Sequence, residues 1–78
     1  MLLKSKFPVM YVFELEELQQ SFYKKPKGNH AKDSSIMLYL NQERKYNISQ
    51  FKKNNSIALK ILLNGDIWWI DKKDVEKF

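Results

Sequence analysis

The sequence predicts one small α+β domain, in which helices precede a C-terminal β-hairpin and a short final helix. Two observations lead to this fold class. Apolar residues at helical spacing follow a cluster of glutamates, and an Asn-Gly pair separates two β-rich runs near the end of the chain. The chain has 78 residues, of which 44% are hydrophobic and 14% aromatic. That composition suits one modest core within a single domain, 1–78, and is too apolar for a disordered chain.

The N-terminal part predicts a short extended segment and then a helix. Residues 7–13 (FPVMYVF) are rich in β-forming residues and lie beside a proline. Residues 14–24 place apolar side chains at i, i+3 and i+7, on one helical face (Leu15, Leu18 and Phe22). Glutamates at the start and lysines at the end of this segment suit the helix dipole, and a proline and a glycine follow it.

The middle of the chain is predicted to continue as a polar loop over 25–33 and a second helix over 34–43. Asp33 or Ser34 could cap that helix. Its apolar residues also alternate, so a strand over 34–43 is the alternative. A third short helix is predicted around 47–55, where Asn47 and Gln50 have the spacing of a capping box.

The hairpin near the C-terminus is the strongest local signal. Asn64-Gly65 favours a two-residue turn in which both residues have positive φ. Such a turn fixes the register as Leu63–Asp66, Leu62–Ile67, Ile61–Trp68, Lys60–Trp69 and Leu59–Ile70. One face should be the core and carry Ile57, Leu59, Ile61, Leu63, Trp68 and Ile70.

The last residues predict a short helix that begins after the hairpin. Asp71 would cap it and Asp74 would lie in its first turn, so that Val75 and Phe78 pack inward.

The stretch ILLNGDIWWIDKKDVEKF resembles the ending of small excisionase-like proteins, which are akin to the DNA-binding domain of MerR-type regulators. Residues 44–55 (RKYNISQFKKNN) look like the basic region that precedes the hairpin in that family. The resemblance implies a winged helix-turn-helix-like fold and a non-catalytic accessory or regulatory DNA-binding role in a mobile element or phage. A basic helix would enter the major groove and the hairpin wing would follow the backbone.

The charge agrees with a polyanionic partner, because 14 Lys and Arg residues outnumber nine Asp and Glu residues and give a net charge of +5. The candidate DNA-binding residues are Arg44, Lys45, Asn47, Ser49, Gln50, Lys52, Lys53, Asn54, Lys60, Trp69, Lys24 and Lys25. Double-stranded DNA is the expected partner, with a recombinase or a second copy as a possible co-partner. Single-stranded DNA is the alternative, in which Trp69 would stack on a base. The bland alternatives are a solvated basic face and a Trp69 buried under the N-terminal segment.

The sequence predicts neither catalysis nor a cofactor or metal. It has no cysteine and one histidine, His30, and its two glycines form no phosphate-binding motif. The N-terminus does not form a secretory signal, and no apolar run is long enough to span a bilayer. A small domain without cysteines is therefore expected in the cytoplasm.

A different class of function is a protein-binding module, such as a small phage-type inhibitor. The face of the hairpin opposite the predicted core carries Ala58, Leu62, Ile67 and Trp69, and these residues are unusually apolar for a solvated surface. The same strip could form a dimer interface.

Overall fold

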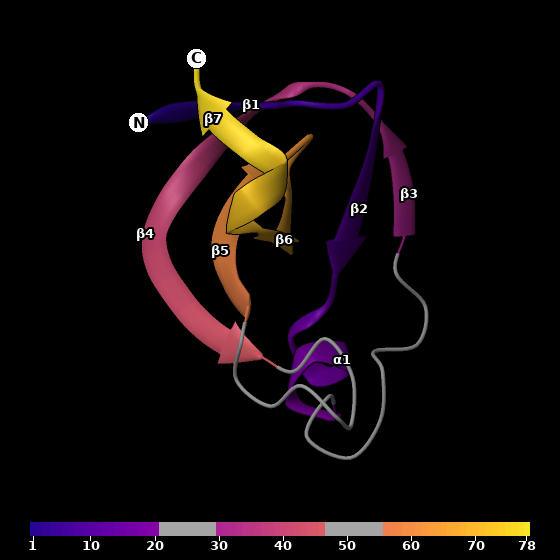
Figure 1. The fold of residues 1–78 in the computed structure, drawn as a ribbon, viewed down its shortest axis with the longest axis vertical. Helices are drawn as coiled ribbons and strands as arrows, with labels where there is room; N and C mark the ends of the chain where they lie inside the picture. Colours follow the sequence, from indigo (N-terminus) through magenta and orange to yellow (C-terminus); the bar gives the residue numbers. More distant parts are fainter. Residues whose placement is uncertain (21–29, 47–55) are drawn as a thin grey trace.

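The computed structural model describes residues 1–20, 30–46 and 56–78, and their seven strands form one antiparallel sheet (Figure 1). In chain order the elements are β1 (Leu2–Ser5), β2 (Val9–Phe13), α1 (Leu15–Gln20), β3 (His30–Asp33), β4 (Ile36–Tyr46), β5 (Ser56–Leu63), β6 (Asp66–Asp71), the 3-10 helix η1 (Lys72–Asp74) and β7 (Val75–Lys77). The order of strands across the sheet is β3-β2-β6-β5-β4-β1-β7.

The predicted α+β, winged helix-turn-helix-like fold is therefore wrong. Residues 34–43 do not form a helix, since β4 runs through them, and the loop predicted over 25–33 ends in strand β3. Of the predicted helix over 14–24, the described part is the six-residue α1. The third predicted helix, around 47–55, lies outside the described residues, as do residues 21–29.

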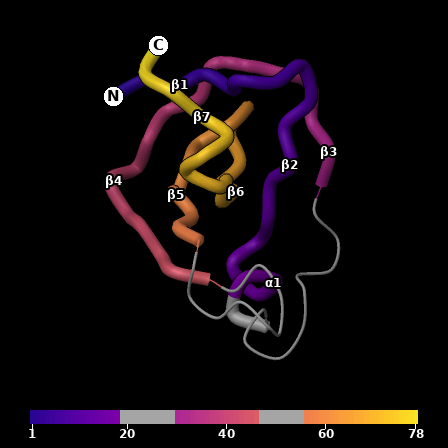
Figure 2. Tube along the Cα trace, in the orientation of Figure 1, coloured from indigo at the N-terminus to yellow at the C-terminus, as the bar shows by residue number. Residues whose placement is uncertain are grey.

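Two pairs of strands form one long bent ribbon, and β3 and β7 are the two ends of the strand order. β1 continues into β2 and β3 into β4, so that β1 pairs with β4 and β2 pairs with β3. β2 also pairs with β6, the last strand of the β4-β5-β6 meander, so β2 and β3 extend the sheet beyond β6 (Figure 2). A register shift between Tyr39 and Glu43, with Asn41 at a φ of 59°, bends β4 within its eleven residues.

The hairpin between β5 and β6 confirms the predicted register at all five pairs, from Leu63–Asp66 to Leu59–Ile70. Asn64 and Gly65 have φ values of 51° and 84°, as a type I′ turn requires. The turn chemistry and the alternating apolar residues specify the same pairing, which is why this element could be derived from local sequence.

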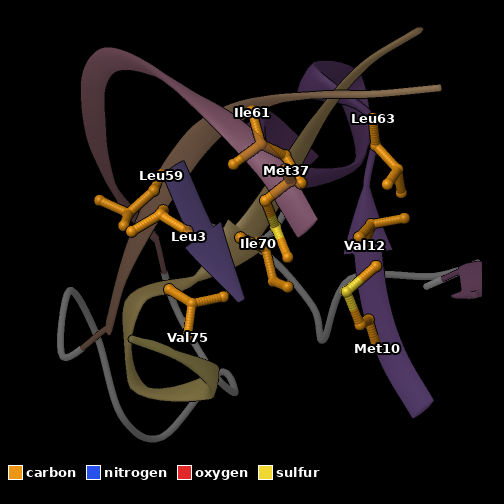
Figure 3. Packing of buried hydrophobic residues seen from close by; sticks show 9 residues of the cluster. All are labelled: Leu3, Met10, Val12, Met37, Leu59, Ile61, Leu63, Ile70 and Val75. Carbon is orange, nitrogen blue, oxygen red and sulfur yellow. The ribbon is translucent and has the colours of Figure 1, made fainter. Parts of the chain in front are cut away.

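The main core fills the inside of the curved sheet. It consists of Leu3, Met10, Val12, Met37, Leu59, Ile61, Leu63, Ile70 and Val75 (Figure 3). Ile57 and Trp68 are partly buried against it, so the predicted assignment of this hairpin face to the core is confirmed. The core also draws on strands that the sequence interpretation had placed in helices or left unassigned.

A second, smaller cluster lies on the outer face under α1. It contains Phe13, Leu18, Tyr46, Ala58 and Trp69. At the start of the helix the backbone N–H of Glu14 donates to Oε1 of Glu17 at 2.8 Å, which is one half of a capping box. Leu18, 1% exposed, anchors the helix to the sheet.

The C-terminal segment is a single 3-10 turn followed by a strand, and the predicted short helix is wrong in type. Its predicted cap is present, because the backbone N–H of Lys73 donates to Oδ1 of Asp71 at 2.9 Å. Val75 is buried as predicted, but Phe78 is 68% exposed and does not pack inward. The strand β7 forms because its backbone pairs with β1 at the edge of the sheet.

The second carboxylate oxygen of Asp71 ties this turn to β4. Oδ2 accepts a hydrogen bond of 2.6 Å from the hydroxyl of Tyr46, which is buried. Burial raises the pKa of Tyr46 far above its ordinary value, and the hydrogen bond that it donates to Asp71 raises it further. The phenol is therefore a neutral donor that fixes the position of the turn.

Candidate protein-docking surface

A row of apolar side chains crosses the outer face of the sheet from β1, the neighbour of edge strand β7, toward α1. Leu2 lies opposite Leu38, Leu38 opposite Leu62, and Leu62 opposite Ile67, on β1, β4, β5 and β6. Directly opposite residues of antiparallel strands point to the same face, so these four side chains form one line. Their neighbours in sequence, such as Leu3, Met37 and Ile61, point inward to the core.

The row extends by one residue at each end. At the β7 edge the backbone N–H of Phe78 donates to the carbonyl of Leu2 at 3.1 Å, which places Phe78 beside Leu2. At the other end Leu15, the first residue of α1, lines the same cleft as Ile67. We call this set the apolar stripe, and it consists of Phe78, Leu2, Leu38, Leu62, Ile67 and Leu15.

Most of the stripe is open to solvent. The exposed fractions are 68% for Phe78, 55% for Ile67, 46% for Leu2 and 39% for both Leu38 and Leu15, and Leu62 is partly buried. Ile36, two residues before Leu38 on the same face, is also exposed. An antiparallel sheet with one solvated face ordinarily carries polar residues there. A contiguous apolar row across it is the pattern of a surface that another layer covers.

Charged groups of both signs border the stripe. Nζ of Lys4 lies 3.6 Å from the Glu76 carboxylate beside Leu2, and both side chains are about half exposed. Nζ of Lys60 lies 3.4 Å from Oε1 of Gln42 on the other side of the row. The described residues hold nine basic and nine acidic side chains, so their side chains have no net charge with His30 neutral.

A cleft of about 340 Å³ lies where the stripe meets α1. Trp69 and Ile67 contribute its apolar wall together with Leu15, and Lys60 and Arg44 contribute cations. Glu14 and Glu43 also line it, and the Glu43 carboxylate lies 3.7 Å from Nζ of Lys72. The cleft thus offers apolar contact and hydrogen-bonding groups of both charges at one end of the stripe.

A second exposed apolar patch shares no residue with the stripe. Phe7, Val9 and Tyr11 surround a hollow of about 460 Å³ with Pro8 and Asp74. The patch draws on β2 and on the short segment before it, whereas the stripe crosses four strands. It provides matched control positions for tests of the stripe.

The histidine joins β3 to α1. Its Nε2 lies 3.0 Å from Oε1 of Glu17, and its ring lies 4.9 Å from the ring of Trp68. Nζ of Lys32 lies 5.1 Å from the same indole ring. These contacts give His30 a structural position between two elements. In the described ranges 1–20, 30–46 and 56–78, no group of three or more His, Asp or Glu residues could hold a metal ion.

The predicted DNA-binding residues fall into three groups: surface residues of the sheet, one buried residue, and residues outside the described ranges. Arg44 and Lys45 are exposed on β4, and Lys60 is bonded to Gln42 on the outer face. Trp69 is only 5% exposed under α1, so its ring faces are not open to a base. The others lie outside the described residues, namely Lys24, Lys25, Asn47, Ser49, Gln50, Lys52, Lys53 and Asn54.

Two of the four residues of the predicted apolar strip lie on the surface. Leu62 and Ile67 belong to the stripe, whereas Ala58 and Trp69 are buried with Phe13 and Leu18. Sequence reasoning missed Leu2, Leu38 and Phe78. Leu38 could have been found from the sequence, because the alternation over 34–43 already offered a strand as the alternative, and that strand contains Leu38.

No helix within the described residues is long and apolar enough to cross a membrane. Comparison of the chain with protein families, with curated proteins and with solved structures finds no match. The resemblance to excisionase-like proteins therefore stays a prediction from the residues.

Proposed function

We propose that this protein is a non-catalytic interaction module that docks onto a protein surface through the apolar stripe. The observation that carries the proposal is the continuous apolar row across four strands, extended at both ends by Phe78 and Leu15. Exposed apolar patches of about 300–600 Å² on small proteins are often functional. The absence of cysteine favours a reducing compartment, so the cytoplasm is part of the proposal.

Site-specific photo-crosslinking tests this function. A photoreactive amino acid at Ile67 or at Leu38 should give discrete crosslinked products in extract from the source cells. The same group at Tyr11, which is exposed on the same face of the sheet, should not. Excess unlabelled protein should compete the products away, but excess Leu38→Glu protein should not. Equal crosslinking from all three positions would contradict the proposal.

A second candidate function, binding of DNA, is favoured by where the net charge lies. Residues 21–29 contain three lysines and residues 47–55 contain two, and neither segment has an acidic residue. Together they account for the whole net charge of +5, since the described residues are balanced. The described residues next to these segments lie toward the α1 end of the sheet, where Tyr46 pairs with Ser56 (Figure 1). Two basic segments attached at one end of a neutral sheet suit a polyanion.

Fluorescence anisotropy of labelled double- and single-stranded oligonucleotides tests this candidate. DNA binding should weaken steeply with salt, whereas docking through the stripe should depend little on it. Lys52→Gln with Lys53→Gln should reduce the affinity and the salt dependence, and Lys77→Gln, on β7, is the matched control. Absence of binding at low salt would exclude this candidate.

A further inference from the structure

We propose that the apolar stripe is covered by a second copy of this chain, so that the protein forms a dimer through the outer faces of two sheets. This inference rests on the proposed function and names its partner. The occupant follows from three properties of the surface: its shape, its area and its charge.

The shape suits another sheet. Four aliphatic side chains of the stripe lie on neighbouring strands about 4.8 Å apart, with Phe78 at the β7 end and Leu15 of α1 at the other. Rows of this kind interdigitate when two sheets stack face to face at about 10 Å. α1 already covers the outer face around Trp69, so the stripe is the part of that face beside α1 that remains open.

The area is enough for a reversible dimer. The exposed fractions of the five most exposed stripe residues correspond to roughly 400 Å² of apolar surface on each copy. Interfaces are about 60% apolar, so the polar rim would bring each copy to roughly 700 Å². That is close to the 800 Å² that each partner contributes to an interface of standard size. An interface of this size is compatible with reversible association at micromolar concentrations.

The charge allows two identical surfaces to meet. Lys4 and Glu76 neutralise each other at one border, and Lys60 is bonded to a neutral amide at the other. The described residues carry equal numbers of basic and acidic side chains, so two copies approach without net repulsion at this face. A partner of one dominant charge would find no complementary field here.

Sedimentation equilibrium of the full chain from about 5 to 500 µM tests the second copy. The weight-average mass should rise from monomer toward dimer, and Ile67→Glu should weaken the association at least tenfold. Tyr11→Glu places the same charge on an exposed apolar residue of the second patch and should associate like the wild type. Circular dichroism confirms folding, and Leu38→Lys serves as an independent stripe variant.

A wild-type chain that stays monomeric at 500 µM overturns the dimer, as does a Tyr11→Glu variant that weakens association as much as Ile67→Glu. The crosslinking experiment tests the proposed function independently of the dimer. If the chain is monomeric but Ile67 and Leu38 crosslink to a different protein, docking stands and the second copy is wrong. If dimers form and the Ile67 crosslinks join two copies, both proposals are supported.

Discussion

Replacement of Trp69 by alanine should strongly destabilise the fold. The indole is 5% exposed and packs with Phe13, Leu18, Tyr46 and Ala58 between α1 and the outer face of the sheet. A buried tryptophan removes about 150–250 Å² from water, which corresponds to roughly 4–6 kcal/mol at about 25 cal/mol per Å². Measured truncations of buried aromatics cost about 3–5 kcal/mol, so we expect a loss in that range.

The loss should be visible against the total stability of so small a domain. For 78 residues the free energy of unfolding should be about 4–12 kcal/mol. Urea unfolding followed by far-ultraviolet circular dichroism measures the change without relying on tryptophan fluorescence. Ile67→Thr is the matched control, because Ile67 lies two residues earlier on the same strand and the same face but is 55% exposed. It should change stability by no more than about 0.5 kcal/mol.

The result also separates two interpretations of the same residue. If Trp69 were a surface ring that stacks on bases, its replacement would leave stability nearly unchanged and weaken binding to single strands. A loss of less than about 1 kcal/mol for Trp69→Ala would refute the buried position under α1.

Three further predictions concern the turns that hold the C-terminal part. Tyr46→Phe removes the 2.6 Å hydrogen bond to partly exposed Asp71 and should lower the free energy of unfolding by about 1–2 kcal/mol, whereas an unchanged urea midpoint would contradict this role. Burial, and then the charge of Asp71, raise the pKa of Asp74 above 3.8, although Lys6 and Lys73 oppose the shift, so its ionised form is disfavoured in the folded state. The stability that protonated Asp74 contributes is therefore present at low pH and is lost as pH rises through the folded pKa. In urea unfolding, the free energy of unfolding of Asp74→Asn relative to the wild type should be higher at pH 7 than at pH 3. A relative free energy that is higher at pH 3 would contradict the raised pKa. Gly65→Ala should cost about 1 kcal/mol in thermal unfolding, because the φ of 84° is strained for alanine although no atom lies within 4 Å of the added Cβ, and a stabilised variant would refute the type I′ turn.

The parts of the fold that local sequence specifies could be predicted. The hairpin register follows from Asn64-Gly65 and the alternation around it, and the cap at Asp71 follows from a short acceptor before a charged turn. Both depend on residues that are close in the chain, so one turn geometry decides the outcome. The extended segment before α1 was predicted for the same reason, and it is β2.

A helix was preferred over strand β4 because the stripe makes both patterns fit. Ile36 and Leu38 point out to solvent while Met37 between them points into the core, so three consecutive residues are apolar and the alternation of Ile36 and Leu38 alone does not identify a half-buried strand. The spacing of Ile36, Met37 and Leu40 then also fits a helix. The feature that hid the strand in the sequence is the feature that we propose as the docking surface.

The two short terminal strands could not be predicted from local sequence. β1 and β7 are four and three residues long, and they form because β1 pairs with β4 and β7 pairs with β1, partners that are distant in the chain. Trp69 shares this dependence. Its burial requires α1 to fold back over the hairpin, a long-range contact that no local pattern encodes.

The most direct test of the stripe is a dilution series of the full chain by ¹H–¹⁵N correlation spectroscopy. If the stripe is the docking surface of a second copy, amide shifts should change with concentration at Leu2, Leu38, Leu62 and Ile67, and stay constant at Tyr11. Shifts that are constant everywhere up to the highest concentration would contradict self-docking. Shifts that cluster around Tyr11 would place the association at the second patch instead of the stripe.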